Sequence, residues 1–517
     1  MNDLNRSKRI AKNSFLLYIR MLFMLIISLY TSRVVLNTLG VVDYGIYNVV
    51  GGVIAMLNFL TNSLGVASSR YITYDLGKGD ITVMKRTIGN ILCIHYFLAL
   101  IIFLLGESIG LWFMETQLQI PVERQNAAFW VYQFSIFTSV ISIIGIPYNA
   151  MIIAHEKMSA FAYISITDAL LKLGMVYLLL VIPYDKLVVY AFLYFCIQAF
   201  DRIVYGIYCK RHFEESHAKI AYNKGLFKNI FSFAGWVMSG SLAAMGFTQG
   251  LNILLNIFFG PVVNAARGIA VQVQIVSQQF CNNFQMALNP QLTKSYAQGD
   301  LNYMHKLLIK SSKFSFYILL FIVMPLMLEA DLVLHWWLGI VPEKTTIFLR
   351  LVLCTSLLAT LSNPIVESVH ASGIIKRFQI IEASLLLTIV PISYFLLKFF
   401  HIAPEFVFVV HIVIEIITQY VRLRIVLPII RMGLKNYVHQ VLKPIIIVCI
   451  LTPILPVVVY QNLSLGDISS FLMVCMTSVI SSSIVIYGFG CTEVERNFLK
   501  NILYNKIFRK FISSTNK

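Results

Sequence analysis

Several arginines lie inside long apolar segments of this sequence, where an ionised side chain is costly unless it meets protein, water or a partner. Arg20 and Arg33 share one such segment, and Arg267 lies near the end of another. A guanidinium forms two parallel hydrogen bonds to phosphate oxygens and stays charged in a poorly solvated site. The arginines therefore predict a wet internal cavity for an anionic headgroup, with Gln249 and Asn252 as further polar lining.

Three other ionisable residues are candidates for proton or cation coupling. Asp168 and Lys172 are four residues apart on one helical face, and Glu415 lies near the middle of its apolar segment. Carboxylates within membrane segments are typical of ion pathways. A second interpretation stays open for Asp168 and Lys172, because i,i+4 partners of opposite charge also neutralise each other. Arg20 likewise lies close enough to a segment end to extend toward water.

The sequence lacks the complete motifs of several enzyme classes. GKGD at 77–80 lacks the upstream glycine and the Ser or Thr of a P-loop, and HEKMS at 155–159 lacks the second histidine of a metalloprotease helix. No Gly-x-Ser-x-Gly elbow is present. The eight cysteines form no CxxC pair, which predicts neither a disulfide framework nor a metal site. We therefore predict a protein that is not an enzyme and uses no cofactor beyond a coupling H⁺ or Na⁺.

The elements that carry these residues are predicted to be membrane helices. The chain is 58% hydrophobic and 13% charged, with a mean hydropathy of +0.77, whereas soluble domains carry about 25% charged residues. Apolar runs of about 20 residues, the length that crosses a bilayer as helix, recur throughout. They predict an all-α polytopic protein with about fourteen transmembrane helices, at 14–36, 44–66, 88–110, 127–150, 159–182, 187–209, 230–256, 262–287, 313–335, 346–368, 378–398, 404–427, 443–461 and 468–490.

The basic residues predict the orientation of these helices. Lys and Arg concentrate in the N-terminus, every second loop and the C-terminal tail, and the opposite loops hold only Arg124, Lys186, Lys344 and Lys398. Positive loops stay in the cytoplasm, so both termini are predicted to be cytoplasmic. The net charge of +17 then belongs to an inner face that contacts anionic inner-leaflet lipids, and we predict no nucleic-acid partner.

An internal repeat organises the chain. SSRYITYDLGKGDITVMKR (68–86) aligns without a gap on LNPQLTKSYAQGDLNYMHK (288–306), and the offset of 220 also pairs Gly40 with Gly260 and Ala67 with Ala287. Six helices per repeat predict two bundles in parallel orientation. The predicted domains are an N-terminal six-helix bundle (1–210), a cytoplasmic linker (211–229), a C-terminal six-helix bundle (230–428), and two further transmembrane helices with a basic tail (429–517).

Three segments carry a resemblance to a known family. SRVVLNTLGVVDYGIYNVVGG (32–52), SSRYITYDLGKGD (68–80) and PYNAMIIAHEKMSAFAYISI (147–166) resemble bacterial polysaccharide transporters, the O-antigen or oligosaccharide flippases of the multidrug/oligosaccharidyl-lipid/polysaccharide exporter superfamily. The resemblance covers most of the chain and implies two six-helix bundles in a V, with two extra helices in some members. It also implies a bacterial inner-membrane location and other polysaccharide assembly proteins as partners.

The activity that this resemblance implies is a flippase. Members carry undecaprenyl-diphosphate-linked oligosaccharide from the cytoplasmic to the periplasmic leaflet by alternating access, for surface glycans such as lipopolysaccharide. Cavity arginines are expected to hold the diphosphate, with Arg20, Arg33 and Arg267 as counterparts by span position, and H⁺ or Na⁺ coupling is a family expectation. Two alternatives stay open, namely a cation-coupled multidrug extruder of the same superfamily and a membrane-embedded polysaccharide polymerase. The short outer loops disfavour the polymerase.

Overall fold

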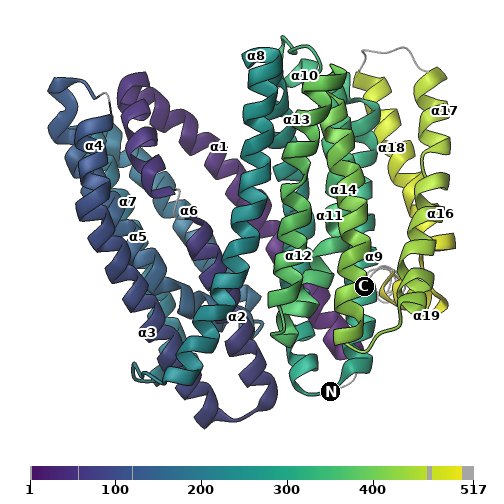
Figure 1. The fold of residues 1–517 in the computed structure, drawn as a ribbon, viewed down its shortest axis with the longest axis horizontal. Helices are drawn as coiled ribbons and strands as arrows, with labels where there is room; N and C mark the ends of the chain where they lie inside the picture. The colour runs from purple at the N-terminus through teal and green to yellow at the C-terminus, as the bar shows by residue number, and fades with distance from the viewer. Residues whose placement is uncertain (1–2, 56–57, 119, 463–467, 504–517) are drawn as a thin grey trace, which may run out of the picture. The chain divides into compact units, whose positions relative to one another are not determined.

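The computed structural model describes residues 3–55, 58–118, 120–462 and 468–503, and within these ranges the chain is helical without a strand (Figure 1). The first half contains α1 (Asp3–Ala55), α2 (Asn58–Lys78), α3 (Ile81–Leu105), α4 (Leu111–Gln117), α5 (Gln125–Ala154), α6 (Met158–Val181) and α7 (Lys186–His212). The second half contains α8 (Lys224–Ala297), α9 (Leu301–Leu328), α10 (Ala330–Leu338), α11 (Thr345–Ser372), α12 (Lys376–Leu387), α13 (Ile389–Phe400), α14 (Phe406–Ile429), α15 (Leu434–Tyr437), α16 (Lys443–Leu451), α17 (Ile454–Asn462), α18 (Ile468–Val485) and α19 (Glu493–Leu503).

The predicted all-helical membrane fold is confirmed, but the count of fourteen spans is not. Among the described residues, twelve helices are long and apolar enough to cross a bilayer. The 74 residues of α8 count once, although α8 covers both predicted spans 230–256 and 262–287. The predicted span 44–66 is not among the twelve, and it crosses the junction of α1 and α2, where residues 56 and 57 lie outside the described residues.

The repeat is visible in the backbone of the two longest helices. Gly40 interrupts α1 at φ 78° and ψ 166°, and Gly260 interrupts α8 at φ 80° and ψ −175°. This region of conformational space is essentially restricted to glycine, because a Cβ clashes with the backbone there. The two glycines are 220 residues apart, so the sequence repeat corresponds to a repeated chain turn.

A second repeated feature lies at the ends of α2 and α8. Gly79 and Gly299 both adopt positive φ, at 80° and 76°, where a helix commonly ends. The next residue in each repeat caps the following helix, since Asp80 accepts a hydrogen bond from the Thr82 amide at 2.9 Å and Asp300 accepts one from the Tyr303 amide at 3.1 Å. The polar segments recognised as a repeat are therefore matching helix–turn–helix connections.

The chain forms two compact units, each assembled from several separate segments. Unit 1 comprises Met1–Gly246, Asn283–Met304 and Glu367–Ser384. Unit 2 comprises Phe247–Asn282, His305–Val366 and Leu385–Lys517. Unit 1 thus combines the first half of the chain with the ends of several second-half helices. The division of the sequence into two six-helix bundles remains a prediction.

Each unit has its own apolar core. In unit 1, α5 packs against α2, α3 and α7, and α6 packs against α1. Buried residues of α1, α4, α5 and α7 form one cluster, and a smaller one joins Val35 of α1, Val176 of α6 and Ile197 of α7. In unit 2, one large cluster draws on α8 to α14, with Leu255, Leu319 and Phe348 fully buried. Close van der Waals packing of these side chains holds the helices together, because lipid tails are as apolar as the side chains and give no hydrophobic driving force between helices.

Candidate functional site

Arg267 lies in a polar group within unit 2 that the turn at Gly260 creates. A straight helix rises about 1.5 Å per residue, so positions 252 and 267 meet only because α8 turns back on itself. The Arg267 side chain is 5% exposed, its Nη1 donates to Asn252 Oδ1, and its Nη2 donates to the Thr248 carbonyl at 3.2 Å. Asn252 Nδ2 in turn donates to Gln249 Oε1 at 3.0 Å. Three predicted substrate-binding residues therefore lie in one hydrogen-bonded group.

The Arg267 guanidinium is surrounded by neutral acceptors. Within the part of the chain that the structure describes, it forms no ion pair with a carboxylate, and its buried Nε has no hydrogen-bond partner. His411 of α14 interacts electrostatically with Arg267 and also with Glu415. A buried cation without a counter-ion carries a large desolvation cost. This site is therefore chemically suited to an anion.

Glu415 lies in a different environment, although it is also buried in unit 2. Its Oε1 accepts from Arg422 Nη1 at 2.5 Å and from the Ser362 hydroxyl at 3.1 Å. Arg422 also donates to Ser362 Oγ at 2.7 Å, and the Ser362 hydroxyl lies 2.8 Å from Gln419 Oε1. The carboxylate thus belongs to an ion pair with Arg422. Its predicted part in ion coupling remains a prediction.

Unit 1 brings Asp168 and Lys172 together as the sequence spacing predicts. Lys172 Nζ lies 2.8 Å from Asp168 Oδ2, and it also lies 5.4 Å from the centre of the Tyr194 ring. Asp201 of α7 interacts electrostatically with both members of this pair. The structure therefore adds a second carboxyl group, which the spacing along α6 alone did not reveal.

The two remaining arginines belong to unit 1, whereas the Arg267 group belongs to unit 2. The Arg20 guanidinium stacks 4.4 Å from the centre of the Phe161 ring, and its buried Nε has no hydrogen-bond partner among the described residues. Arg33 is exposed on α1. The prediction that Arg20, Arg33 and Arg267 share one headgroup site is not tested by these positions, because Arg20 and Arg33 belong to unit 1 and Arg267 to unit 2.

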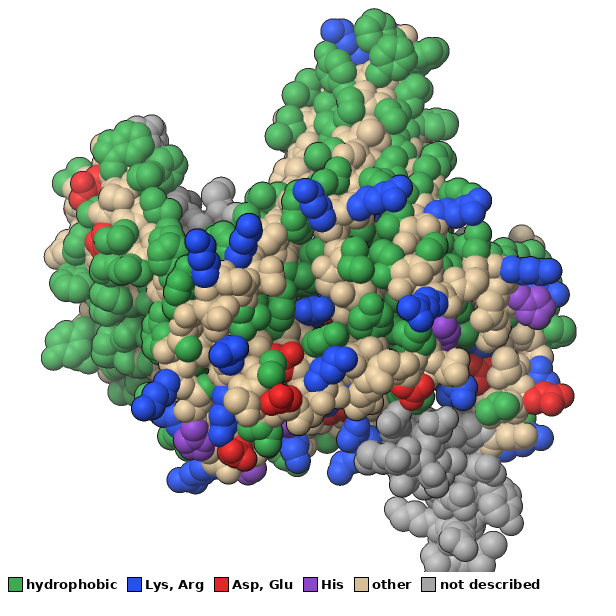
Figure 2. Space-filling model, turned by 60° about the horizontal axis from the view of Figure 1, so that its bottom comes forward, with side chains coloured by type: hydrophobic (Ala, Val, Ile, Leu, Met, Phe, Trp, Pro, Cys, Tyr) green, Lys and Arg blue, Asp and Glu red, His purple; other side chains and the backbone are tan. Residues whose placement is uncertain are grey.

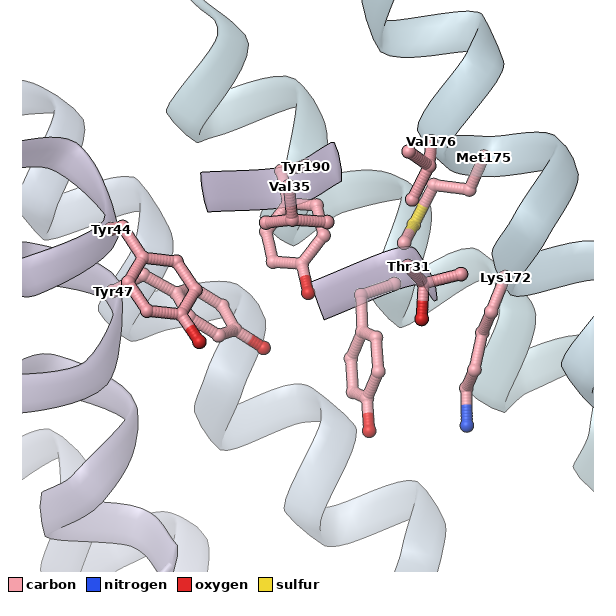
Figure 3. A pocket seen from close by; sticks show the side chains of 9 residues that line it. Thr31, Val35, Tyr44, Tyr47, Lys172, Met175, Val176 and Tyr190 are labelled. Carbon is pink, nitrogen blue, oxygen red and sulfur yellow. The ribbon is translucent and has the colours of Figure 1, made fainter. Parts of the chain in front are cut away.

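A pocket in unit 1 lies beside the Asp168–Lys172 pair, with a volume of about 110 Å³. We call it the tyrosine pocket. Figure 3 shows the hydroxyls of Tyr44, Tyr47 and Tyr190 and the ammonium of Lys172 extending in one direction, with the apolar side chains of the wall beside them. Its lining consists of Thr31, Val35, Tyr44, Tyr47, Lys172, Met175, Val176, Tyr190 and Tyr194.

Sequence reasoning missed a contact between Arg70 and the end of α11 in unit 1. Arg70 of α2 donates from Nε to the His370 carbonyl at 3.2 Å and from Nη2 to the Ala371 carbonyl at 3.3 Å. A cation at these last carbonyls also interacts favourably with the helix dipole. Burial lowers the pKa of Arg70. Its place inside the repeated segment was the only sequence signal.

A second missed contact joins the end of α5 to the end of α8. The Glu156 side chain is almost fully buried and accepts from Lys294 Nζ at 3.0 Å, from Gln291 Nε2 at 3.0 Å and from Arg9 Nη2 at 2.8 Å. At the repeat offset of 220, Gln291 and Lys294 correspond to Tyr71 and Tyr74, which neighbour Arg70 along α2. Equivalent helices of the two repeats therefore bind the ends of α11 and α5.

Basic side chains are numerous on one face of the molecule. Figure 2 shows many Lys and Arg side chains on the face that includes the turn between α2 and α3. This turn lies in the repeated segment, which the charge distribution predicts to be cytoplasmic. The picture is consistent with the predicted distribution of charge among the loops.

Comparison with known proteins identifies the family. Residues 10–296, more than half of the chain, match the family described as "Polysaccharide biosynthesis protein". No curated protein sequence matches the chain.

Solved structures share the fold. A MOP superfamily transporter from Pyrococcus furiosus, described as having a binding pocket of reverse polarity, superposes with a TM-score of 0.67 at 14% identity, over 82% of this chain and 97% of that one. An outward-facing multidrug resistance MATE family transporter superposes with a TM-score of 0.70 at 15% sequence identity, over 82% of this chain and 96% of that one. The MATE transporter ClbM in complex with Rb⁺ superposes with a TM-score of 0.70 at 12% sequence identity, over 83% of this chain and 97% of that one.

The family match and the shared fold confirm the recognised resemblance, and the solved structures with this fold are transporters rather than enzymes. The polymerase alternative is not supported. The chain belongs to the polysaccharide biosynthesis protein family. It has the fold of MOP superfamily transporters, with twelve helices among the described residues that could span a membrane.

Proposed function

We propose that the protein is a flippase for undecaprenyl-diphosphate-linked oligosaccharide. The diphosphate binds at the Arg267 group, the sugars pass through a polar cavity, and the prenyl tail stays in the lipid. Alternating access exposes the headgroup site first to the cytoplasmic and then to the periplasmic leaflet. The family name, which refers to polysaccharide biosynthesis, supports this substrate class.

The observation that carries the proposal is the environment of Arg267. This guanidinium is 5% exposed and bonds only to the neutral oxygens of Asn252 and Thr248 among the described residues. A diphosphate would supply the missing negative charge and would accept the fork of parallel N–H bonds that Arg provides. A transporter of organic cations gains nothing from an uncompensated arginine, since like charges repel.

The cellular setting follows from the same proposal. The protein resides in the bacterial inner membrane with both termini in the cytoplasm, because the positive loops alternate consistently along the chain. Its partners are the lipid-linked oligosaccharide, anionic inner-leaflet lipids and the proteins that assemble surface glycans such as O-antigen. An H⁺ or Na⁺ gradient supplies the driving force.

The test follows labelled lipid-linked oligosaccharide, leaflet by leaflet, in a strain that lacks the protein. Wild type, Arg33→Ala and Arg267→Ala are returned in turn, with Arg350→Ala as control. Arg350 is a suitable control because its Nη2 pairs with Asp331 Oδ2 at 3.2 Å and it does not belong to the Arg267 group. We expect Arg267→Ala to slow translocation roughly tenfold or more, since hydrogen bonds to charged groups contribute about 1.5–3 kcal/mol. Full activity of Arg267→Ala would place the headgroup site elsewhere. Accumulation of unpolymerised repeats in the periplasm would contradict the flippase itself.

A multidrug extruder is the second candidate. The solved MATE structures share the fold, and the carboxyls of Asp168 and Asp201 lie close together in unit 1, as a site for an organic cation requires. The test is sensitivity of the deletion strain to cationic dyes. The flippase proposal predicts unchanged sensitivity, whereas sensitivity that wild type reverses and Asp201→Asn does not would favour the extruder.

A further inference from the structure

The tyrosine pocket has no part in the headgroup contacts of Arg267, yet the repeat gives it an equivalent position. At the offset of 220, Tyr47 corresponds to Arg267. Both follow the repeated turn by seven residues, and both face the helix segment that precedes it. Tyr47 lines a pocket with Thr31, and Arg267 bonds to Asn252. Each repeat therefore places one polar group on the inner side of its own turn, with different chemistry in each.

The side-chain charges exclude an ionic ligand from the tyrosine pocket. Lys172 lines the pocket with its ammonium directed as the tyrosine hydroxyls are (Figure 3). This charge opposes an organic cation inside the pocket, because the two carboxyls that would attract one, those of Asp168 and Asp201, do not line it. An anion gains little, because Asp168 lies 2.8 Å from this ammonium and Asp201 adds a second carboxyl group beside it. The remaining ligand class is an uncharged polar molecule.

The lining suits one face and one edge of a sugar ring. The Tyr47 and Tyr190 rings meet edge to face, with 4.8 Å between their centroids. The two rings form an aromatic surface against which the C–H groups of a sugar can pack. Tyrosine hydroxyls can both donate and accept hydrogen bonds, as sugar hydroxyls require. The Thr31 hydroxyl donates to the Ile27 carbonyl at 2.9 Å, so it can serve a sugar only as an acceptor. Val35, Met175 and Val176 form an apolar wall. The volume of about 110 Å³ is on the scale of a single sugar ring.

We infer that the tyrosine pocket is a subsite for one uncharged sugar ring of the transported glycan, separate from the diphosphate contacts of Arg267. This inference rests on the proposed flippase function. It divides recognition between the two repeats, with the arginine-bearing turn for the charged headgroup and the tyrosine-bearing turn for a neutral sugar.

The experiment uses the full chain in lipid nanodiscs and saturation-transfer NMR. The three probes are methyl β-D-glucopyranoside, tetraethylammonium and inorganic pyrophosphate. The pocket variants are Tyr47→Phe and Tyr190→Phe, which keep the rings and remove one hydroxyl each. The matched controls are Tyr30→Phe and Tyr177→Phe, on α1 and α6, because these two hydroxyls lie 2.8 Å apart and do not line the pocket. Gel filtration establishes that every variant is folded.

We expect the glucoside to bind wild type, and each pocket variant to weaken its affinity roughly two- to tenfold, the effect of one neutral hydrogen bond. The controls and Arg267→Ala should bind the glucoside as wild type does. Equal glucoside binding by pocket variants and wild type, or none by wild type, overturns the inference. If pyrophosphate still binds in an Arg267-dependent manner, the proposed function survives that result. Binding of tetraethylammonium in the tyrosine pocket overturns both the sugar subsite and the flippase function, and it supports the multidrug extruder.

Discussion

At the scale of single residues, two buried arginines of unit 2 differ in the groups that surround their charge. Arg422 lies 2.5 Å from the Glu415 carboxylate and shares Ser362 with it. Arg267 meets only neutral oxygens within the described residues. The first charge is compensated within the fold, and the second is available to compensate a ligand. The same residue type therefore lies in two different environments in two apolar helices, and we propose a binding role for Arg267 alone.

Removing one charge of the Glu415–Arg422 pair should destabilise the protein much more than removing both charges. Arg422→Gln leaves a buried carboxylate without its cation, and loss of one buried partner typically destabilises a protein by about 3–5 kcal/mol. We expect a clear fall in melting temperature for Arg422→Gln, and recovery of much of it in Arg422→Gln with Glu415→Gln. Thermal unfolding in detergent measures both. Equal melting temperatures for the single and double variants would contradict the ion-pair account.

At the scale of helices, the two repeated turns decide which side chains meet. Gly260 turns α8 so that Arg267 returns to Asn252, and Gly40 turns α1 so that Tyr47 and Thr31 line one pocket. Neither glycine has another atom close enough to obstruct an added Cβ. The requirement for glycine is thus set by backbone conformation rather than by packing.

Gly260→Ala should therefore destabilise the protein, although the added methyl group meets open space. The positive φ at this position costs about 1–3 kcal/mol for a residue with a Cβ. Gly268→Ala is the matched control, because it lies in the same helix, has an ordinary φ and also meets nothing within 4 Å. We expect it to be neutral or stabilising, since alanine favours helix. Equal melting temperatures for the two variants would show that the turn at Gly260 is not strained.

At the scale of the whole molecule, the two repeats meet at equivalent residues. A Cβ built on Gly77 of α2 lies 2.9 Å from the Cβ of Ala297 in α8, and the two positions are 220 residues apart. Around this contact, Arg70 binds the end of α11 and Lys294 binds the end of α5 through Glu156. Unit 1 therefore holds equivalent helix ends of the two repeats together.

If transport requires these helix ends to separate, a covalent bond between them should stop it. Gly77→Cys with Ala297→Cys places two sulfurs within reach of a disulfide after a small backbone adjustment. We expect oxidation of this double variant to abolish translocation and a reducing agent to restore it. Either single variant is the control for oxidation of the native cysteines. Undiminished transport by the fully cross-linked variant would mean that α2 and α8 stay together throughout the cycle.

The sequence alone determined the features that depend on local composition and spacing. Hydropathy predicted membrane helices, because any helix that crosses a bilayer must be apolar over about 20 residues. The recurrence of Gly40 at Gly260 and of Asp80 at Asp300 predicted a repeat, since turn and cap residues are selected by local backbone geometry. The Asp168–Lys172 pair was also predictable, because i,i+4 spacing places both on one helical face.

Only the tertiary structure decided which distant residues meet. Glu156 contacts Lys294 across 138 positions, and Arg70 contacts the His370 carbonyl across 300. Glu415 proved to have a partner in Arg422, and Arg267 proved to have neutral ones, although all are polar residues of apolar helices. Hydropathy specifies that such residues must face inward, but packing determines what each one faces. The tyrosine pocket, built from three helices, follows from the same physical reason.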